Sequence, residues 1–143
     1  MKLKNNIAIL QFIKYACVGV MNTIVTFIVI FLCKDLLEIN EYVSNAIGYV
    51  CGLINSFIWN KRWVFKSNKK AHTEAIKFAA GFLLCYGLQL FTVWFLNENT
   101  PVGDIELNIF GIYTLGGYGI ATFIGNVAYT LANFIYNRLV TFK

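Results

Sequence analysis

The chain carries the stretch Asn55-Ser-Phe-Ile-Trp-Asn-Lys-Arg-Trp-Val-Phe-Lys66 and repeats it at its end as Asn133-Phe-Ile-Tyr-Asn-Arg-Leu-Val-Thr-Phe-Lys143. When residues 47–66 are aligned with residues 124–143, which lie 77 positions later, 8 of 20 positions are identical. Two unrelated apolar segments would share some of these matches, but not a glycine, an asparagine and the final lysine together. The sequence therefore predicts a tandem duplication.

The chain is rich in apolar residues and poor in charge. Hydrophobic residues make up 58% of it and charged residues only 13%, whereas a soluble domain is about half apolar and a quarter charged. The charges cluster at the ends of apolar segments whose lengths approach the roughly 20 residues that cross a bilayer. We predict an all-α integral membrane protein with four transmembrane helices, at residues 15–33, 44–60, 75–96 and 118–136. An eight-stranded barrel is the alternative, but the apolar runs are continuous rather than alternating.

The four predicted helices form two hairpins. The first repeat covers residues 9–66 and the second residues 74–143, within a single membrane domain over residues 1–143. Two hairpins that begin and end on the same side are related by a parallel repeat, with its axis along the membrane normal. The connection at residues 97–117 is longer than its counterpart, and we expect a short amphipathic segment there, at the outer interface.

The charged residues predict the orientation. Eleven of twelve Lys and Arg residues lie at the amino terminus, between residues 61 and 77, or at the carboxyl end, whereas six of seven acids lie in the other two connections. The positive-inside rule then places both termini and the middle connection in the cytoplasm. Cations beside membrane ends indicate topology, so no nucleic acid partner is expected.

Several classes of function are disfavoured by the sequence. No small-residue cleavage site precedes Lys34-Asp35, so we expect the first apolar run to be retained rather than cleaved as a signal peptide. The four cysteines form no Cys-x-x-Cys pair and His72 is single, so no metal or cofactor is expected. No carboxylate lies inside a predicted span, which argues against a proton-coupled exporter. Because no phosphate-binding glycine loop or catalytic set is visible, the protein is not predicted to be an enzyme.

Carboxamide side chains recur on the apolar helices. Those that we predict to line a groove between helices are Asn22, Asn55, Asn60, Gln89, Asn126, Asn133 and Asn137. Asn and Gln both donate and accept hydrogen bonds, so they can line a path for a polar ligand. Small and weakly polar residues are also how membrane helices pack together, and helix packing is therefore the alternative interpretation.

The segment Phe12-Ile-Lys-Tyr-Ala-Cys-Val-Gly-Val-Met-Asn-Thr23 resembles the opening motif of the GtrA-like family of small four-span bacterial membrane proteins. Residues 55–65 and 133–142 are similar to the ends of the second and fourth spans of that family. The resemblance implies translocation of a polyprenyl-phosphate-linked monosaccharide across the inner membrane. The sugar would then modify surface polysaccharide or teichoic acid.

The sequence departs from the family pattern at a few positions. Thr26 stands where the family commonly has an acid. The second copy of the repeat has Leu139 and Val140 where the first has Arg62 and Trp63. Whether the two halves contact a ligand equally is therefore open.

The ligand implied by the resemblance has an anionic phosphodiester, a polar sugar and a long apolar tail, and its head group crosses hydrocarbon unaided only at high cost. We expect five cations near the cytoplasmic ends of the spans to bind the phosphate: Lys14, Lys61, Arg62, Lys77 and Arg138. Arg offers bidentate contacts and Lys a point charge, while the carboxamides suit the sugar hydroxyls. Orientation of the chain, and snorkelling to lipid head groups, are the alternative roles of these cations.

The expected partners are the lipid-linked sugar, the membrane, glycosyltransferases of the same pathway and further copies of the chain. Four short helices enclose little volume around a sugar phosphate, so we predict a homo-oligomer, most simply a dimer. Two other functions are kept as alternatives. One is a non-transporting membrane partner of a polyprenyl-phosphate glycosyltransferase, and the other is a small drug or cation exporter.

Overall fold

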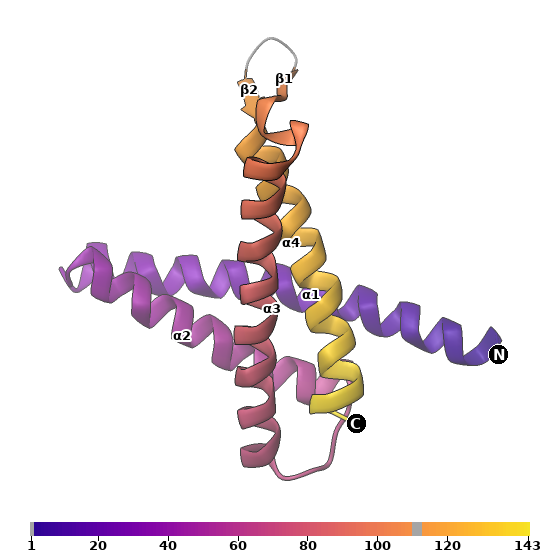
Figure 1. Cartoon of the computed structure of the whole chain (residues 1–143). Coiled ribbons are helices and arrows are strands. Elements are labelled where there is room, and N and C mark those ends of the chain that lie inside the picture. Colours follow the sequence, from indigo (N-terminus) through magenta and orange to yellow (C-terminus); the bar gives the residue numbers. More distant parts are fainter. Residues whose placement is uncertain (1, 110–112) are drawn as a thin grey trace. The chain divides into compact units, whose positions relative to one another are not determined.

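The structure, a computed structural model, describes residues 2–109 and 113–143 and consists mainly of helices (Figure 1). The four long helices are α1 (Lys2–Phe31), α2 (Glu41–Trp59), α3 (Ala71–Asn99) and α4 (Gly117–Tyr136). Each predicted span falls on one of these helices, so the prediction of an all-α fold is confirmed. Both α1 and α3 begin earlier than the spans predicted for them.

Capping residues explain where two of the helical segments start. The side chain of Asn40 accepts a hydrogen bond from the amide of Tyr42 at 2.9 Å and caps α2. Thr100 accepts in the same way from the amide of Val102 at 3.3 Å. It starts a short 3-10 helix, η3 (Pro101–Asp104), whose proline occupies a first-turn position where no amide hydrogen is needed.

Three of the four long helices end in a π-helical turn, in which amides bond to carbonyls five residues back. These turns are η1 (Leu32–Leu36), η2 (Asn60–Val64) and η4 (Asn137–Thr141). The last two lie 77 residues apart, inside the repeated stretch of the sequence. The first two are followed by a residue with positive φ, Glu38 at 54° and Lys66 at 52°. In both cases the next amide bonds back to a carbonyl six residues earlier, at 2.9 Å, and closes the helix end.

The connection between α3 and α4 differs from its prediction. Instead of an amphipathic segment it contains η3, then β1 (Glu106–Ile109) and β2 (Tyr113–Gly116), which pair antiparallel with Glu106 opposite Gly116. Polar and apolar residues alternate along β1, and a period of two residues suits a strand rather than a helix. The expectation of an amphipathic segment is therefore wrong for these strands, while residues 110–112 lie outside the described residues.

The chain divides into two compact units, each built around one helical hairpin. The first unit contains Met1–Lys70 with Phe142, and the second contains Ala71–Thr141 with Lys143. Within the first unit α1 packs against α2, and within the second α3 packs against α4 (Figure 1). We call the α1–α2 pair with η2 hairpin one, and the α3–α4 pair with η4 hairpin two. Their interpretation as two repeats of a single membrane domain stays a prediction.

Glycines allow the paired helices to approach closely. A Cβ atom on Gly48 or Gly52 of α2 would collide with the side chain of Ile30 or Thr26 of α1. Gly125 of α4 likewise has no room for a Cβ atom against α3. Gly48 and Gly125 are 77 residues apart, so both hairpins use the same position of the repeated sequence for close helix packing, as membrane helices commonly do.

The burial pattern is the reverse of that in a water-soluble core. Large apolar side chains lie on the outer surface of all four helices, for example Phe27, Tyr49, Leu83 and Phe123, each at least 65% exposed. Small or polar side chains are buried instead, among them Ser44, Asn60, Asn133 and Asn137. Lipid tails solvate an apolar exterior, and small and polar residues hold helices together inside a bilayer. The pattern therefore favours a membrane environment.

Two helical segments, among the residues that the structure describes, are long and apolar enough to cross a bilayer: Asn6–Leu36 and Ala71–Asn99. The other two long helices are shorter, with 19 residues in α2 and 20 in α4. At 1.5 Å per residue they span about 28 to 30 Å, close to the thickness of the hydrocarbon core. Crossing by all four helices, with both termini on one side, stays a prediction.

Candidate functional site

Hairpin one gathers its predicted phosphate-binding cations at one end. The Nζ atom of Lys14, from α1, lies 5.4 Å from the centroid of the Trp63 ring in η2, within the range of a cation–π contact. Lys61 and Arg62 directly precede that tryptophan, and Arg62 is exposed. The Nζ atom of Lys61 donates to the carbonyl of Lys69 at 2.6 Å. Three predicted residues from two helices are therefore neighbours at the end of hairpin one.

Hairpin two repeats this arrangement with different groups. The Nζ atom of Lys77, from α3, donates to the carbonyl of Val140 in η4 at 3.5 Å. Val140 lies 77 residues after Trp63, so each hairpin brings the lysine of its first helix to the same position of the repeated stretch. Arg138 precedes Val140 by two residues and is half-buried. The lysine contacts a ring in one hairpin and a backbone carbonyl in the other.

A buried asparagine begins each of these terminal turns. Asn60 is 1% exposed and Asn137 is fully buried. The amide group of Asn60 donates to the carbonyl of Ser56 at 2.8 Å, and that of Asn137 donates to Oδ1 of Asn133 at 3.1 Å. In both residues Oδ1 is buried and accepts no hydrogen bond from the described part of the chain. A buried acceptor without a donor costs about 1–3 kcal/mol, so both oxygens are suited to a ligand that donates.

The remaining carboxamides bond to side chains within their own hairpin. Asn55 donates to Oδ1 of Asn22 at 2.7 Å, between α2 and α1. Gln89 donates to Oδ1 of Asn126 at 2.6 Å, between α3 and α4. Asn133 donates to the hydroxyl of Tyr129 at 3.2 Å, along α4. These bonds contribute to helix packing, and a groove-lining role for the same residues stays a prediction.

The sequence analysis missed a buried acid. Glu74 is 2% exposed and lies in the first turn of α3, which begins at Ala71. Because the predicted span starts only at residue 75, this acid was assigned to the preceding connection. An acid in a first helical turn interacts favourably with the helix dipole and is a recognised start signal, so an earlier helix start was within reach of the sequence.

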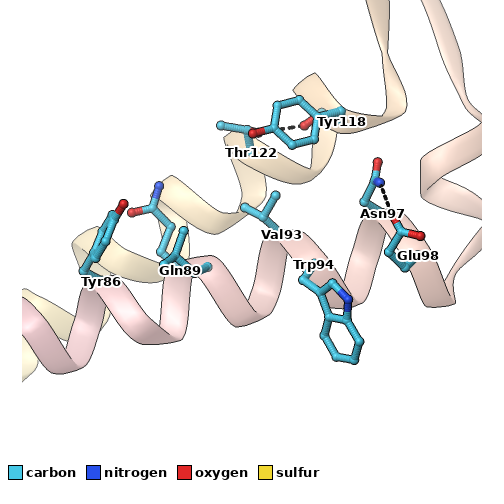
Figure 2. A pocket seen from close by; sticks show the side chains of 9 residues that line it. Tyr86, Gln89, Val93, Trp94, Asn97, Glu98, Tyr118 and Thr122 are labelled. Carbon is cyan, nitrogen blue, oxygen red and sulfur yellow. Dashed lines mark hydrogen bonds between the residues drawn. The ribbon is translucent and has the colours of Figure 1, made fainter.

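A pocket between α3 and α4 was also missed (Figure 2). Its volume is about 420 Å³. The residues that line it are Tyr86, Gln89, Leu90, Val93, Trp94, Asn97, Glu98, Tyr118 and Thr122. Gln89 alone among them belongs to the predicted site residues. The lining combines two helices that are separated by η3 and a β-hairpin, so no local motif announces it.

Comparison with known proteins identifies the family. A family model described as "GtrA/DPMS, transmembrane domain" matches residues 14–142. The chain belongs to this family. The resemblance noted in the sequence is thereby confirmed, and the family together with the apolar helices places the GtrA/DPMS chain in a membrane.

Individual relatives add printed descriptions. The "Uncharacterized membrane protein YngA" of Bacillus subtilis (strain 168) is 26% identical over 133 residues, which cover 90% of this chain and 77% of that protein. The "Cell wall teichoic acid glycosylation protein GtcA" of Listeria innocua is 23% identical over 130 residues, which cover 90% and 82%. The "Bactoprenol-linked glucose translocase" of Shigella phage SfII is 32% identical over 60 residues, which cover 42% of this chain and 50% of that protein.

Proposed function

We propose that this GtrA/DPMS protein translocates a polyprenyl-phosphate-linked monosaccharide across the bacterial inner membrane, for modification of surface polysaccharide or teichoic acid. The family assignment supports this proposal. So do the names of two relatives, one a translocase of a lipid-linked glucose and one a teichoic acid glycosylation protein.

The observation that carries the proposal is the buried, unpaired Oδ1 beside cations at the end of each hairpin. In hairpin one the oxygen belongs to Asn60, which directly precedes Lys61 and Arg62. In hairpin two it belongs to Asn137, which directly precedes Arg138. A lipid-linked sugar offers the matching chemistry, because its phosphodiester is an anion for the cations and its hydroxyls are donors for the oxygen.

The proposed orientation puts these hairpin ends at the cytoplasmic face. Cations at that face satisfy the positive-inside rule, and they meet the phosphate of a carrier made in the cytoplasm. All four helices then span the membrane, with both termini inside. Because α2 and α4 are about as long as the hydrocarbon core is thick, their terminal π turns lie at the membrane boundary in this arrangement.

The carboxamide pairs provide the next contacts along the path. Asn22 with Asn55, and Gln89 with Asn126, lie deeper in their hairpins than the terminal asparagines. Hydrogen bonds between membrane helices contribute only about 0.6–2 kcal/mol each. Exchange of such a bond for one to a sugar hydroxyl is therefore nearly balanced in free energy. A head group can move from one pair to the next without leaving a donor or acceptor unpaired.

The proposal includes a homo-oligomer, most simply a dimer, and downhill movement pulled by consumption of the sugar outside. Direct catalysis is not part of it. The sugar donor would come from a polyprenyl-phosphate glycosyltransferase on the cytoplasmic side, and an external glycosyltransferase would remove the product.

Reconstitution of the purified protein in liposomes tests this function. A lipid-linked monosaccharide is incorporated, and its accessibility to a membrane-impermeant glycosidase is followed over time. The expected result is a protein-dependent second phase of cleavage, as the inner-leaflet pool appears outside. Cleavage that stops at the outer-leaflet pool, as in protein-free liposomes, would refute translocation. If a glycosyltransferase then co-purified with the protein, the role of a non-transporting partner would be supported instead.

A further inference from the structure

We infer that the pocket between α3 and α4 is a second, separate sugar site, which binds an uncharged monosaccharide head group at the far end of hairpin two from its cations. This inference rests on the proposed function, because it names where the transported sugar is held after passage. The pocket volume of about 420 Å³ lies within the range of roughly 300–1,000 Å³ that is usual for small-molecule sites.

The distance between the two ends of hairpin two fits such a role. Lys77, at the cation end, and Asn97, in the pocket lining, are 20 residues apart on one continuous helix. At 1.5 Å per residue this separates them by about 30 Å, which is the thickness of a bilayer hydrocarbon core. The cation end and the pocket therefore lie at opposite boundaries of a membrane that α3 crosses. Figure 1 shows α3 and α4 side by side along this length.

The polar groups of the pocket are suited to sugar hydroxyls. Asn97 donates to Oε1 of Glu98 at 2.7 Å, and Thr122 donates to the carbonyl of Tyr118 at 2.7 Å (Figure 2). Gln89 donates to Asn126 on the neighbouring helix at 2.6 Å. These bonds use donor hydrogens and leave the amide oxygens, the hydroxyl oxygen and a carboxylate oxygen as acceptors. A ligand rich in O–H donors complements such a lining.

Aromatic side chains complete the site. Tyr86 and Trp94 come from α3 and Tyr118 from α4. Tyr118 is 67% exposed and Trp94 56%, so their ring faces are open to a ligand. The C–H face of a sugar ring is apolar and packs on an aromatic face, while its hydroxyls reach the acceptors at the rim.

Charge separates this site from the cation end. Among the lining residues that the structure describes there is one carboxylate, Glu98, and neither Lys nor Arg. A phosphodiester would face a like charge at short range, which is unfavourable. The pocket therefore admits the sugar and repels the phosphate, whereas Lys77 and Arg138 at the other end attract the phosphate. The two ends of hairpin two recognise different parts of one molecule.

The competing explanation is an aromatic belt, because Tyr and Trp gather at membrane interfaces without binding any ligand. A matched pair of variants separates the two. Tyr118→Leu removes a ring that lines the pocket, and Phe95→Leu removes a ring at the same end of α3 that does not line it. Phe95 is 45% exposed, so both changes remove a partly exposed aromatic ring near one membrane boundary.

The binding test uses the full chain in lipid nanodiscs. The probes are the methyl glycosides of glucose, galactose and N-acetylglucosamine, with glucose 1-phosphate as the charged comparison, and binding is measured by saturation-transfer NMR. At least one methyl glycoside is expected to bind, and glucose 1-phosphate is expected to bind more weakly at this site. Asn97→Ala and Tyr118→Leu should each weaken glycoside binding about three- to tenfold, the effect of one lost contact. Phe95→Leu should bind like the unmodified protein, and Glu98→Gln should raise glucose 1-phosphate binding relative to the glycoside.

Three results would overturn the inference: no glycoside binds, Tyr118→Leu and Phe95→Leu lose binding equally, or Glu98→Gln leaves the preference against the phosphate unchanged. The liposome assay described above distinguishes this failure from failure of the proposed function. Translocation without glycoside binding would retain the function and reject the site. Glycoside binding that depends on Asn97, without translocation, would retain the site and reject the function.

Discussion

Replacement of Asn60 by leucine tests whether its buried oxygen is held for a ligand. In most proteins, removal of a buried polar side chain destabilises the fold because it breaks hydrogen bonds. Here the side chain makes bonds only through its amide group, to the carbonyl and hydroxyl of Ser56 at 2.8 and 3.2 Å, while Oδ1 has no donor among the described residues. Asn60→Leu removes both the bonds and the unpaired oxygen.

The two effects oppose each other and can be compared. Loss of a neutral hydrogen bond costs about 0.5–1.5 kcal/mol, whereas relief of an unsatisfied buried acceptor returns about 1–3 kcal/mol. The net change in the free energy of unfolding for Asn60→Leu therefore lies between a loss of about 0.5 and a gain of about 2.5 kcal/mol. Its affinity for the lipid-linked sugar should fall about two- to tenfold, as expected for one lost neutral hydrogen bond.

Asn22→Leu is the matched control for stability. Its Oδ1 accepts from Asn55 at 2.7 Å, so the change leaves the Asn55 amide unpaired and should cost about 1–3 kcal/mol. Both variants are unfolded by heat and by denaturant in the same detergent and followed by circular dichroism. If Asn60→Leu destabilised the protein as much as Asn22→Leu, the oxygen of Asn60 would be satisfied in the folded state, and the reasoning would be wrong.

Three further predictions concern the cations, the orientation and the helix ends. Lys61→Gln with Arg62→Gln should insert normally but bind a polyprenyl phosphosugar about ten- to a hundredfold more weakly, since each charge-assisted bond contributes about 1.5–3 kcal/mol; unchanged binding would leave these cations an orienting role only. Single cysteines in a cysteine-free background should react with an impermeant reagent in intact cells when placed in residues 99–104 and not in residues 67–73, and the opposite pattern would reverse the orientation. Glu38→Gly should unfold at a higher temperature than Glu38→Ala, because φ at this position is 54° and a Cβ atom there costs about 1–2 kcal/mol; equal midpoints would contradict this.

The helices were predictable because their apolar runs are long and continuous. The ends of the helices were less so. Residues before position 15 are polar enough to be assigned outside the span, yet α1 extends back to Lys2, since helix propensity continues where apolarity stops. The strands β1 and β2 were missed because four residues of alternating polarity are too short a signal beside a long apolar run.

The candidate site was predictable only in part, because contacts between helices depend on their register. The repeated stretch indicates that Asn60 and Asn137 hold equivalent positions. It does not indicate that their amide groups bond backwards along the helix and leave Oδ1 unpaired. The bond between Asn22 and Asn55 likewise requires α1 and α2 to be aligned to within one helical turn, and no pattern within either segment contains that information.

The positive-φ residues of hairpin one have a consequence for how such a chain can change over evolutionary time. Glycine adopts this backbone conformation without steric cost, yet the two positions carry a negative charge, at Glu38, and a positive one, at Lys66. Each residue therefore terminates a helix and also labels one end of the hairpin with the charge sign that the insertion machinery reads. A glycine would make a firmer stop and erase the label. Selection for stability and selection for orientation thus pull in opposite directions at the same two residues.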